Sequence, residues 1–471
     1  MMRNETPTVQ AIIVTWNKKE DVLRLLSQLK DIDYPEDKLL LLVVDNNSTD
    51  GTVQAIESDY PSVKLIKHAE NLGGAGGFNS GMRWAIENSP GAEYLWLLDN
   101  DIQVDSNALS ALVAAMTANP GAAICGSRIM NLENRNELIE AGAFIDYHFG
   151  DIICNRPDKK TFGDSSKVFK VDYVAACSLL ARVSHVKKMG IWREEFFIYW
   201  DDMEWGMRFN RAGYDVLAST ASIVYHPSWV QRATDYSAVW RNYYRTRNAL
   251  WVFNNYCGDI ERRLLLCRMI YRFMRYAAGN CLISQTGLSR AYTSGIRHFF
   301  CGGYGRKNFD PPLTDIAALV GPNESGILPV FVPDVASFDK ISAFVDSLIG
   351  KANRVELKLI VPERDRGRWQ HRYLQSDLMS YKRSPNGAIS WRDKIRIMKF
   401  LKNCGPWRII ISPVPPPKMA TIWGRFVAKI DPERGTVISI ERVRVKDFLW
   451  IIFNTPVFLC KSLLFPPIKN I

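Results

Sequence analysis

The sequence predicts an open α/β fold for the first half of this chain. Between residues 8 and 227, short runs rich in β-branched and aliphatic residues alternate with helical patterns, as in a parallel sheet covered by helices. The run at 94–98 is apolar throughout, which is typical of a strand buried on both faces. Three runs lead into Thr15, Asp45 and Asp99. Because open α/β sheets bind ligands at the carboxyl ends of their strands, we expect these residues to line a site.

The individual elements are predicted in chain order. Strands are expected at 9–14, 39–44, 63–67 and 94–98. A helix is expected at 18–29, and a short helix follows the Asp50-Gly51 turn. A glycine-rich loop at 71–77 is expected to lead into a helix that ends near Ile86.

Length and composition describe an ordinary globular chain with a basic surface. Its 471 residues are 47% hydrophobic and 23% charged, enough for two or three domains. A net charge of +11 favours an anionic partner. Nine cysteines, an odd number without a CxxC pair, predict reduced thiols. Residues 1–10 lack an export segment, which favours a cytoplasmic location.

The middle of the chain is strongly basic. Residues 241–309 hold twelve Lys or Arg and two Asp or Glu. A helical pattern at 262–278 places Arg268, Arg272 and Arg275 on one face; the opposite face is apolar and consists of Leu266, Ile270, Phe273 and Ala277. Two interpretations are equally good: this helix lies on an anionic membrane surface, or it packs on the main domain with its basic face in water.

Four segments follow from these patterns: 1–240, 241–312, 313–445 and 446–471. The third has strand-like runs at 327–332, 356–361, 407–412 and 437–445, with a turn or linker at 413–417, and predicts a second, smaller α/β region. Whether that region is a catalytic module, a scaffold or a homo-oligomer interface stays open. The apolar tail is interrupted at 454–456 and 461, so a monotopic membrane contact is expected there in preference to a spanning helix.

Two acidic clusters carry the chemistry. Asp99-Asn100-Asp101 follows the buried 94–98 strand, where two carboxylates could bridge Mn²⁺ or Mg²⁺ to a diphosphate. The other cluster, at 200–205, holds Asp201, Asp202 and Glu204 between Trp200 and Trp205. One carboxylate would cap the helix that runs through Arg211, and another, desolvated between the indoles, would serve as a general base. The structural alternative is an acidic helix start that complements the helix dipole.

Three weaker signals complete the candidate site. The glycine-rich loop, which begins at Asn71 and Gly73, could let the backbone approach a sugar or diphosphate, although a flexible turn explains it as well. His226 ends an apolar run and could complete a metal site, although most such histidines are structural. Asp45 could accept a hydrogen bond from the imide of uracil or thymine; its alternative is a turn residue.

In their order along the chain, these motifs resemble glycosyltransferase family 2, inverting enzymes of the GT-A fold. The resemblance covers residues 8 to about 250 and rests on Val14-Thr15-Trp16-Asn17, the 44–52 motif and the acidic clusters. Within that family, the 71–78 motif, the 200–205 cluster, His226 and Tyr244-Arg245-Thr246-Arg247-Asn248 resemble the galactofuranosyltransferase branch.

The resemblance implies roles for individual residues. Asp99, Asp101 and His226 would hold the metal, Asp202 would deprotonate the acceptor, and Asp201, Glu204, Trp200 and Trp205 would position the acceptor. The nucleotide would contact Thr15, Asn17, Asp45, Asn47, Asn71, Gly73 and Asn100. It further implies a UDP-galactofuranose donor and a glycan acceptor on a polyprenyl diphosphate carrier, used in bacterial surface polysaccharide synthesis at the inner face of the plasma membrane.

Other functions remain as alternatives. The same chemistry with dTDP-rhamnose would need the same fold, and a non-catalytic membrane-docked assembly protein would use the acidic residues only as caps and turns. Nucleic-acid binding is not expected, because the basic residues concentrate in one amphipathic segment without a base-reading motif. The chain departs from the family pattern at Asn100, where a third Asp would stand, and the second α/β region does not align with the family. The polymerising mycobacterial members carry a β-rich domain ahead of the catalytic one, whereas here the first predicted strand begins almost at once.

Overall fold

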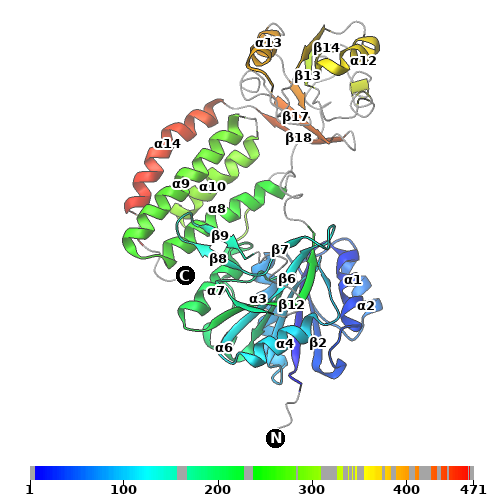
Figure 1. Cartoon of the computed structure of the whole chain (residues 1–471), viewed down its shortest axis with the longest axis vertical. Coiled ribbons are helices and arrows are strands. Elements are labelled where there is room, and N and C mark those ends of the chain that lie inside the picture. Colours follow the sequence, from blue (N-terminus) through cyan, green and yellow to red (C-terminus); the bar gives the residue numbers. More distant parts are fainter. Residues whose placement is uncertain are drawn as a thin grey trace.

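The computed structural model describes most of the chain. The described residues are 6–155, 167–227, 237–282, 285–308, 326–331, 355–373, 377–382, 389–402, 409–412, 426–431, 436–442 and 445–464, with Phe338, Ser342, Val345, Asp346 and Pro466. An N-terminal α/β domain, a layer of long helices and a second α/β region follow one another along the molecule (Figure 1).

The N-terminal domain is built on one ten-stranded sheet. Its strands are β1 (Val9–Thr15), β2 (Leu39–Asp45), β3 (Lys64–Lys67), β4 (Tyr94–Asp99), β5 (Gln103–Val104), β6 (Ala122–Asn131), β7 (Leu138–Glu140), β10 (Val168–Lys170), β11 (Ser178–Arg182) and β12 (Asp215–His226). The main order is β10-β12-β6-β11-β4-β1-β2-β3, with β5 on β12 and β7 on β6. Strands β4, β1, β2 and β3 are parallel, as their apolar composition predicts.

Helices cover both faces of this sheet. They are α1 (Lys19–Lys30), α2 (Thr52–Asp59), α3 (Gly73–Asn88), α4 (Ala108–Ala118), α6 (Val183–Met189) and α7 (Asp201–Arg211), with 3₁₀ turns η1 (Glu36–Lys38) and η2 (Glu194–Phe196). One core contains apolar residues of α1, α2 and α4, and the other those of α3, α6 and α7. The predicted α/β fold is therefore confirmed, and the four predicted strands are in place.

The glycine-rich segment differs from its prediction. Its glycines do not form a loop: α3 already begins at Gly73, so they make up the first turns of the helix. A Cβ at Gly77 would lie 2.6 Å from Val14 Cγ1, closer than packed atoms approach. Glycine therefore allows α3 to pack closely on β1, and this packing outweighs the low helix propensity of glycine.

The basic middle of the chain forms a helical layer. Its helices are α8 (Ser237–Tyr256), α9 (Asp259–Leu282) and α10 (Thr286–Cys301), and α14 (Val445–Leu464) packs beside them. Leu266, Ile270 and Ala277 are fully buried in this layer. The apolar face of the 262–278 helix is therefore packed inside the protein, as the second of the two interpretations expected. Helix α8 begins at Ser237, so the expected division between residues 240 and 241 falls inside a helix.

A hairpin joins the N-terminal domain to this layer. It consists of β8 (Ala143–Asp146) and β9 (Asp151–Cys154). Arg272 of α9 donates a hydrogen bond to the Gly150 carbonyl in the hairpin turn at 3.0 Å and lies 3.6 Å from Asp151.

The second region is α/β, as predicted, but its sheet has six strands where the sequence predicted four. Its strands are β13 (Gly326–Phe331), β14 (Val355–Pro362), β15 (Asp377–Tyr381), β16 (Ile409–Ser412), β17 (Phe426–Asp431) and β18 (Thr436–Arg442), with η4 (Glu363–Asp365), α12 (Arg366–Arg372) and α13 (Trp391–Lys402). The order is β15-β14-β13-β16-β17-β18, and β18 alone among these six is antiparallel to its neighbour. The expected turn at 413–417 and the division at 312 lie outside the described residues.

Two further expectations concern the tail and the thiols. In the part of the chain that the structure describes, one helical stretch, Asp447–Leu464, meets the length and composition of a membrane span, with mean hydropathy 1.4. Eight cysteines lie in the described residues and form no disulfide with one another; that the thiols are reduced stays a prediction.

Candidate active site

The predicted strand ends meet at one edge of the sheet. Thr15 pairs with Asp45 across β1 and β2, and Val14 pairs with Asp99 across β1 and β4. The side-chain amide of Asn100 donates a hydrogen bond to Thr15 Oγ1 at 2.8 Å. Residues that are 85 positions apart in the chain thus lie together because parallel strands end at the same edge.

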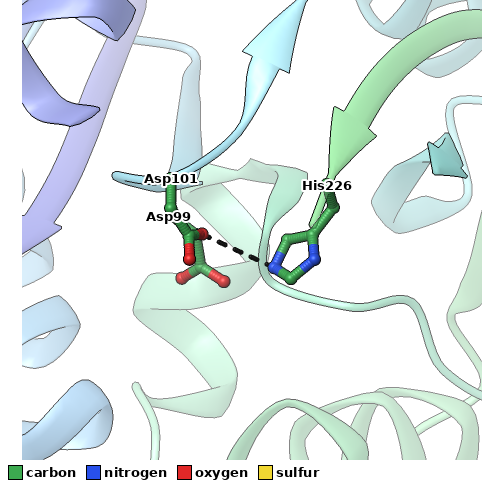
Figure 2. Close-up of side chains that lie close together, drawn as sticks. All are labelled: Asp99, Asp101 and His226. Carbon is green, nitrogen blue, oxygen red and sulfur yellow. Dashed lines mark ion pairs between the residues drawn. The ribbon is translucent and has the colours of Figure 1, made fainter. Parts of the chain in front are cut away.

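Three potential metal ligands converge beside this edge. Asp99 ends β4, Asp101 follows one residue later, and His226 ends β12. One ligand atom from each lies within 4.8 Å of the others, and Figure 2 shows the three side chains facing one another. Asp101 and His226 are buried, and His226 Nε2 lies 3.5 Å from Asp101 Oδ1.

The backbone orients His226 for a ligand role. Its Nδ1 lies 2.7 Å from the Pro227 carbonyl oxygen, which can only accept a hydrogen bond. Nδ1 therefore carries a proton, and in the neutral ring Nε2 presents its lone pair towards the carboxylates. Two carboxylates and one imidazole form a donor set that fits a divalent cation such as Mn²⁺.

Backbone and side-chain amide groups gather at the ends of β1 and β2. Asn17 and Asn47 both adopt positive φ, and Asn17 Oδ1 accepts a hydrogen bond from the Thr49 amide at 2.7 Å. Asp45 is buried, and its Oδ2 accepts a hydrogen bond from the Ser48 amide at 2.9 Å. Its Oδ1 is buried and accepts no hydrogen bond from the described residues. An unpaired buried carboxylate oxygen calls for a donor, and the imide N–H of a pyrimidine base would supply one.

The start of α3 contacts the end of β2, where Asn46 Nδ2 donates a hydrogen bond to the Gly73 carbonyl at 2.9 Å. Asn71 Oδ1 accepts a hydrogen bond from the Gly73 amide at 2.8 Å, and Gly73 has φ +75°. A Cβ at Gly73 would lie 2.1 Å from the carbonyl oxygen of Phe197. Only glycine fits here, both for its backbone angle and for its space.

The second acidic cluster begins α7. Asp202 accepts hydrogen bonds from the amides of Ala176 at 3.2 Å and Met203 at 2.8 Å. Burial raises the pKa of Asp202 to about 6. Burial, followed by the charge of Asp202, raises the pKa of Asp201 well above its usual range. The helix begins and ends as predicted, but the residue at its N-cap is Trp200, and neither aspartate has that position.

The two acidic clusters meet at a short segment between β10 and β11. The Ala176 amide donates a hydrogen bond to the Asp202 carboxylate. The backbone carbonyl of the next residue, Cys177, accepts a hydrogen bond from the Asp99 amide at 3.2 Å. Burial raises the pKa of the Cys177 thiol well above its usual range, and the charges of Asp99, Asp101 and Asp202 raise it further. The metal cluster and the candidate base thus share one site.

Two predicted acceptor ligands are corrected by the structure. Trp205 is fully buried, and its indole donates a hydrogen bond to the Gly190 carbonyl at 2.9 Å. Glu204 is also fully buried, and Arg193 and Arg208 pair with its two oxygens. Both face the core because residues three to four positions into α7 lie on its inner face, so neither contacts solvent. Trp200 is 5% exposed and packs against Phe253.

Sequence reasoning missed a third acid. Glu140, at the end of β7, is fully buried, and the Tyr173 hydroxyl lies 3.4 Å from its Oε2. The charge of Glu140 also raises the pKa of the buried Cys177 thiol, so this carboxylate lies near the segment that the two acidic clusters contact. A lone Glu on a three-residue strand carries no pattern in the sequence, and only packing reveals it.

Comparison with known proteins agrees with this geometry. The model of the family described as "Glycosyl transferase family 2" matches residues 10–190. The chain carries a glycosyl transferase family 2 domain. This family 2 domain includes β1 to β4, the metal cluster up to Asp101, and the Ala176-Cys177 segment. It has the GT-A fold that the resemblance implied.

Individual relatives share this half of the chain. Galactofuranosyltransferase GlfT2 of Mycolicibacterium smegmatis is 25% identical over 266 residues, which are 51% of this chain and 40% of that protein. N-acetylglucosaminyl-diphospho-decaprenol L-rhamnosyltransferase of Mycobacterium tuberculosis is 25% identical over 239 residues, 47% of this chain and 76% of that protein. The chain thus spans about two fifths of the galactofuranosyltransferase's length.

Among solved structures, mannosyltransferase PcManGT from Pyrobaculum calidifontis, in complex with GDP-Man and Mn²⁺, aligns with a TM-score of 0.42 and 15% identity. The alignment covers 63% of this chain and 88% of that one.

Proposed function

We propose that this chain is a metal-dependent inverting glycosyltransferase that moves galactofuranose from UDP-galactofuranose to a glycan acceptor. The observation that carries the proposal is that the cluster of Asp99, Asp101 and His226 and the partly buried Asp202 lie around the short Ala176-Cys177 segment of a family 2 domain. A cation site and a base of raised pKa on opposite sides of one bound sugar are the parts that the reaction needs.

Asp99, Asp101 and His226 would hold Mn²⁺ or Mg²⁺. The cation, when bound, neutralises negative charge that builds on the leaving diphosphate. The protein's part is to fix the ligands: the Asp99 amide donates a hydrogen bond to the Cys177 carbonyl, and His226 Nδ1 contacts the Pro227 carbonyl.

Asp202 would serve as the general base. Its carboxylate takes the proton of an acceptor hydroxyl as the hydroxyl oxygen forms a bond to the anomeric carbon. The bond from that carbon to the UDP oxygen breaks on the opposite face, its electron pair leaves with UDP, and the configuration inverts. With a pKa of about 6, Asp202 is ionised at neutral pH and remains a stronger base than an exposed aspartate.

Nucleotide binding would involve the residues at the ends of β1 and β2. The unpaired Asp45 Oδ1 supports recognition of a pyrimidine imide. Thr15, Asn17, Asn47 and Asn100 lie around the same strand ends and would contact the ribose or diphosphate, together with Asn71 and Gly73.

A donor panel tests the proposal. The full-length protein is incubated with Mn²⁺, a polyprenyl-diphosphate-linked or synthetic glycan and each of UDP-galactofuranose, UDP-glucose and dTDP-rhamnose, and nucleotide release and product mass are measured. We expect transfer with UDP-galactofuranose, and about a 10²–10⁴-fold loss of rate with unchanged UDP affinity in Asp202→Asn. If no donor supports transfer, or if Asp202→Asn turns over normally, the proposal is wrong.

A rhamnosyltransferase is the second candidate. One observation favours it: the rhamnosyltransferase relative has the same 25% identity and is matched over 76% of its length, against 40% for GlfT2. Both donors carry a pyrimidine imide, so Asp45 fits either. The dTDP-rhamnose arm of the panel distinguishes them.

The helical layer supports a place at an anionic membrane, where a lipid-linked acceptor of surface polysaccharide synthesis would lie. Ile451 and Phe458 of α14 are buried, and Phe458 stacks on Phe300 with ring centroids 5.8 Å apart. The outward face of α14 is apolar, with Phe453 72% and Leu464 81% exposed. A helix with one face packed on the protein and an exposed apolar face fits a monotopic contact with the inner face of the plasma membrane.

Basic residues accompany this apolar face. Arg263, Arg268 and Arg275 of α9 and Lys461 of α14 are exposed in the same layer. Their charges would add attraction to anionic headgroups, which a purely apolar contact would lack.

A further inference from the structure

The seven residues before α7, 194–200, have a strained backbone. Phe197, Tyr199 and Trp200 adopt φ values of 66°, 66° and 68°. Side chains other than glycine rarely occupy this left-handed region, and such conformations persist only where the surroundings hold them. Because Trp200 directly precedes Asp201 and Asp202, its backbone angle sets where both carboxylates point.

The side chain of Arg247, in α8, holds the first part of this segment. Arg247 is fully buried. Its Nη2 donates hydrogen bonds to the carbonyls of Glu195 at 3.0 Å and Phe196 at 2.9 Å. Its Nη1 donates to the Gly305 carbonyl at 2.9 Å, and the Gly305 amide in turn donates to the Glu195 carbonyl at 2.8 Å. One guanidinium thus joins two chain segments through their backbones.

The next residue holds the strained part itself. Asn248 is also fully buried, and its Nδ2 donates to the carbonyls of Ile198 at 2.9 Å and Tyr199 at 2.8 Å. Its Oδ1 accepts a hydrogen bond from Arg247 Nε at 2.8 Å. The two side chains therefore hold each other in place and donate their hydrogen bonds to backbone carbonyls. Because these contacts are to the backbone, they fix the path of the segment independently of its side chains.

Stacking from the same helix reinforces these bonds. The Phe197 ring stacks on Tyr244 with centroids 5.1 Å apart, and Tyr199 stacks on Trp240 at 6.2 Å. The Arg247 guanidinium lies 5.0 Å from the Tyr244 ring centroid, which favours a buried cation.

The opposite side of the segment touches the start of α3. The Phe197 carbonyl accepts a hydrogen bond from the Ala75 amide at 3.1 Å, and Gly73 leaves room for that carbonyl. A Cβ at Gly74 would lie 3.9 Å from Asp201 Oδ2. The segment is therefore fixed between α8 and the nucleotide side of the site, with the candidate base at its end.

We propose that Arg247 and Asn248 are positioning residues that hold the 194–200 segment in its strained course and thereby aim Asp202 at the acceptor hydroxyl. This inference rests on the proposed function. A misplacement of the base by about 1 Å costs on the order of 10² in rate. The helical layer is thus part of the catalytic arrangement as well as a surface.

The test compares Arg247→Lys with Arg262→Lys. Arg262 is a matched control because it is a buried arginine of the same layer, on α9, whose Nη1 donates to Asn254 Oδ1 at 3.1 Å. Measurements are Tm, UDP affinity by calorimetry, kcat and KM for transfer, the pH profile of kcat, and hydrogen exchange of residues 194–203 by mass spectrometry.

For Arg247→Lys we expect faster exchange in 194–203, UDP affinity within about twofold, kcat lower by about 10–100-fold and a displaced acid limb of the pH profile. Asn248→Ala, which keeps the arginine, should change the same quantities in the same direction. Arg262→Lys should lower Tm without changing exchange in 194–203 or the pH profile.

Three outcomes separate the inference from the proposed function. If Arg247→Lys lowers Tm but keeps the kcat, pH profile and exchange of the wild type, the inference is overturned while the proposed function stands. If the wild type transfers no sugar, the proposed function fails, and exchange still reports whether Arg247 holds the segment. If Arg247→Lys does not fold, Asn248→Ala decides on the same readouts.

Discussion

Asp201 and Asp202 are consecutive carboxylic acids at the start of α7; Asp201 is buried, Asp202 is partly buried, and the charge of Asp202 raises the pKa of Asp201. Burial raises the pKa of Asp202 to about 6, and burial together with the Asp202 charge raises the pKa of Asp201 further. Since two adjacent buried charges are costly, the pair loses its protons in two separate steps. The two proton losses therefore belong to the pair.

The first prediction concerns the pH dependence of transfer. Because the base must be ionised, kcat should rise with pH along a limb with an apparent pKa of about 6, the value to which burial raises Asp202. An ordinary exposed aspartate would place this limb near pH 4. Steady-state rates between pH 4.5 and 8.5 under saturating substrates test this; a flat profile across pH 5–7 would contradict the assignment of Asp202.

The second prediction concerns stability. The pKa of Asp202 is raised on folding, so the folded state binds this proton more tightly than the unfolded state does. The stabilisation from that proton is complete below about pH 4 and is lost as pH rises through about 6, at most about 3 kcal/mol. Asp202→Asn should therefore lower the pH dependence of unfolding free energy between pH 4 and 7, measured by denaturant titration. An unchanged slope would show that Asp202 is not the group responsible.

The third prediction concerns the metal site. Asp101→Asn and His226→Gln should each weaken Mn²⁺ binding by about 10-fold or more, because each removes one of three converging ligands. Calorimetric titration with Mn²⁺ alone measures this without reference to activity. Glu87→Gln, an exposed acid of α3, is the control and should bind as the wild type does. Equal Mn²⁺ affinity in all four proteins would rule out this cluster as the metal site.

The fourth prediction concerns Gly73. Gly73→Ala introduces a strained φ and a contact with the Phe197 carbonyl, whereas Gly51→Ala introduces a strained φ of +82° with no atom within 4 Å. We expect a loss in unfolding free energy of about 1–2 kcal/mol for Gly51→Ala and about 1–3 kcal/mol more for Gly73→Ala. Only Gly73→Ala should also lower kcat, since it displaces the 194–200 segment. Equal effects of the two changes would show that the carbonyl contact is unimportant.

The fifth prediction concerns the membrane. The double variant Phe453→Ser/Leu464→Ser should bind phosphatidylglycerol-containing vesicles about tenfold more weakly in flotation assays, because it removes the two most exposed apolar side chains of α14. Val168→Ser, which changes a 42% exposed valine on β10, should leave binding unchanged. Binding of the wild type should also fall as salt increases, since the exposed arginines contribute. Vesicle binding that survives the double change would exclude α14 as the contact.

Much of the site was predictable because its residues follow strands. Asp45 and Asp99 come directly after continuous apolar runs, and parallel pairing brings such strand ends together. The approach of His226 to Asp101 follows from the same rule, because β12 runs in the same direction as the parallel strands. The α9 helix was also predictable from its period, and its apolar face is buried where one of the two interpretations placed it.

The roles within the 200–205 cluster were not predictable. Asp202 and Glu204 are two positions apart and have the same charge. Yet Asp202 accepts a hydrogen bond from the Ala176 amide in the site, while Glu204 forms ion pairs with Arg193 and Arg208 in the core. The difference arises from the rotation of α7 against the sheet. Periodicity does not reveal that rotation, because both residues lie in an acidic first turn.

By itself, the sequence determined the α/β class, the strand ends and the residue types available for a cation and a base, since these depend on local hydrophobic pattern and on parallel pairing. Tertiary structure alone decided that the glycines of 73–77 form helix, that Trp205 is core, and that Arg247 and Asn248 bind carbonyls about fifty residues away. Those outcomes depend on which surfaces meet, and a buried hydrogen bond to backbone leaves no trace in the sequence of the segment that it holds.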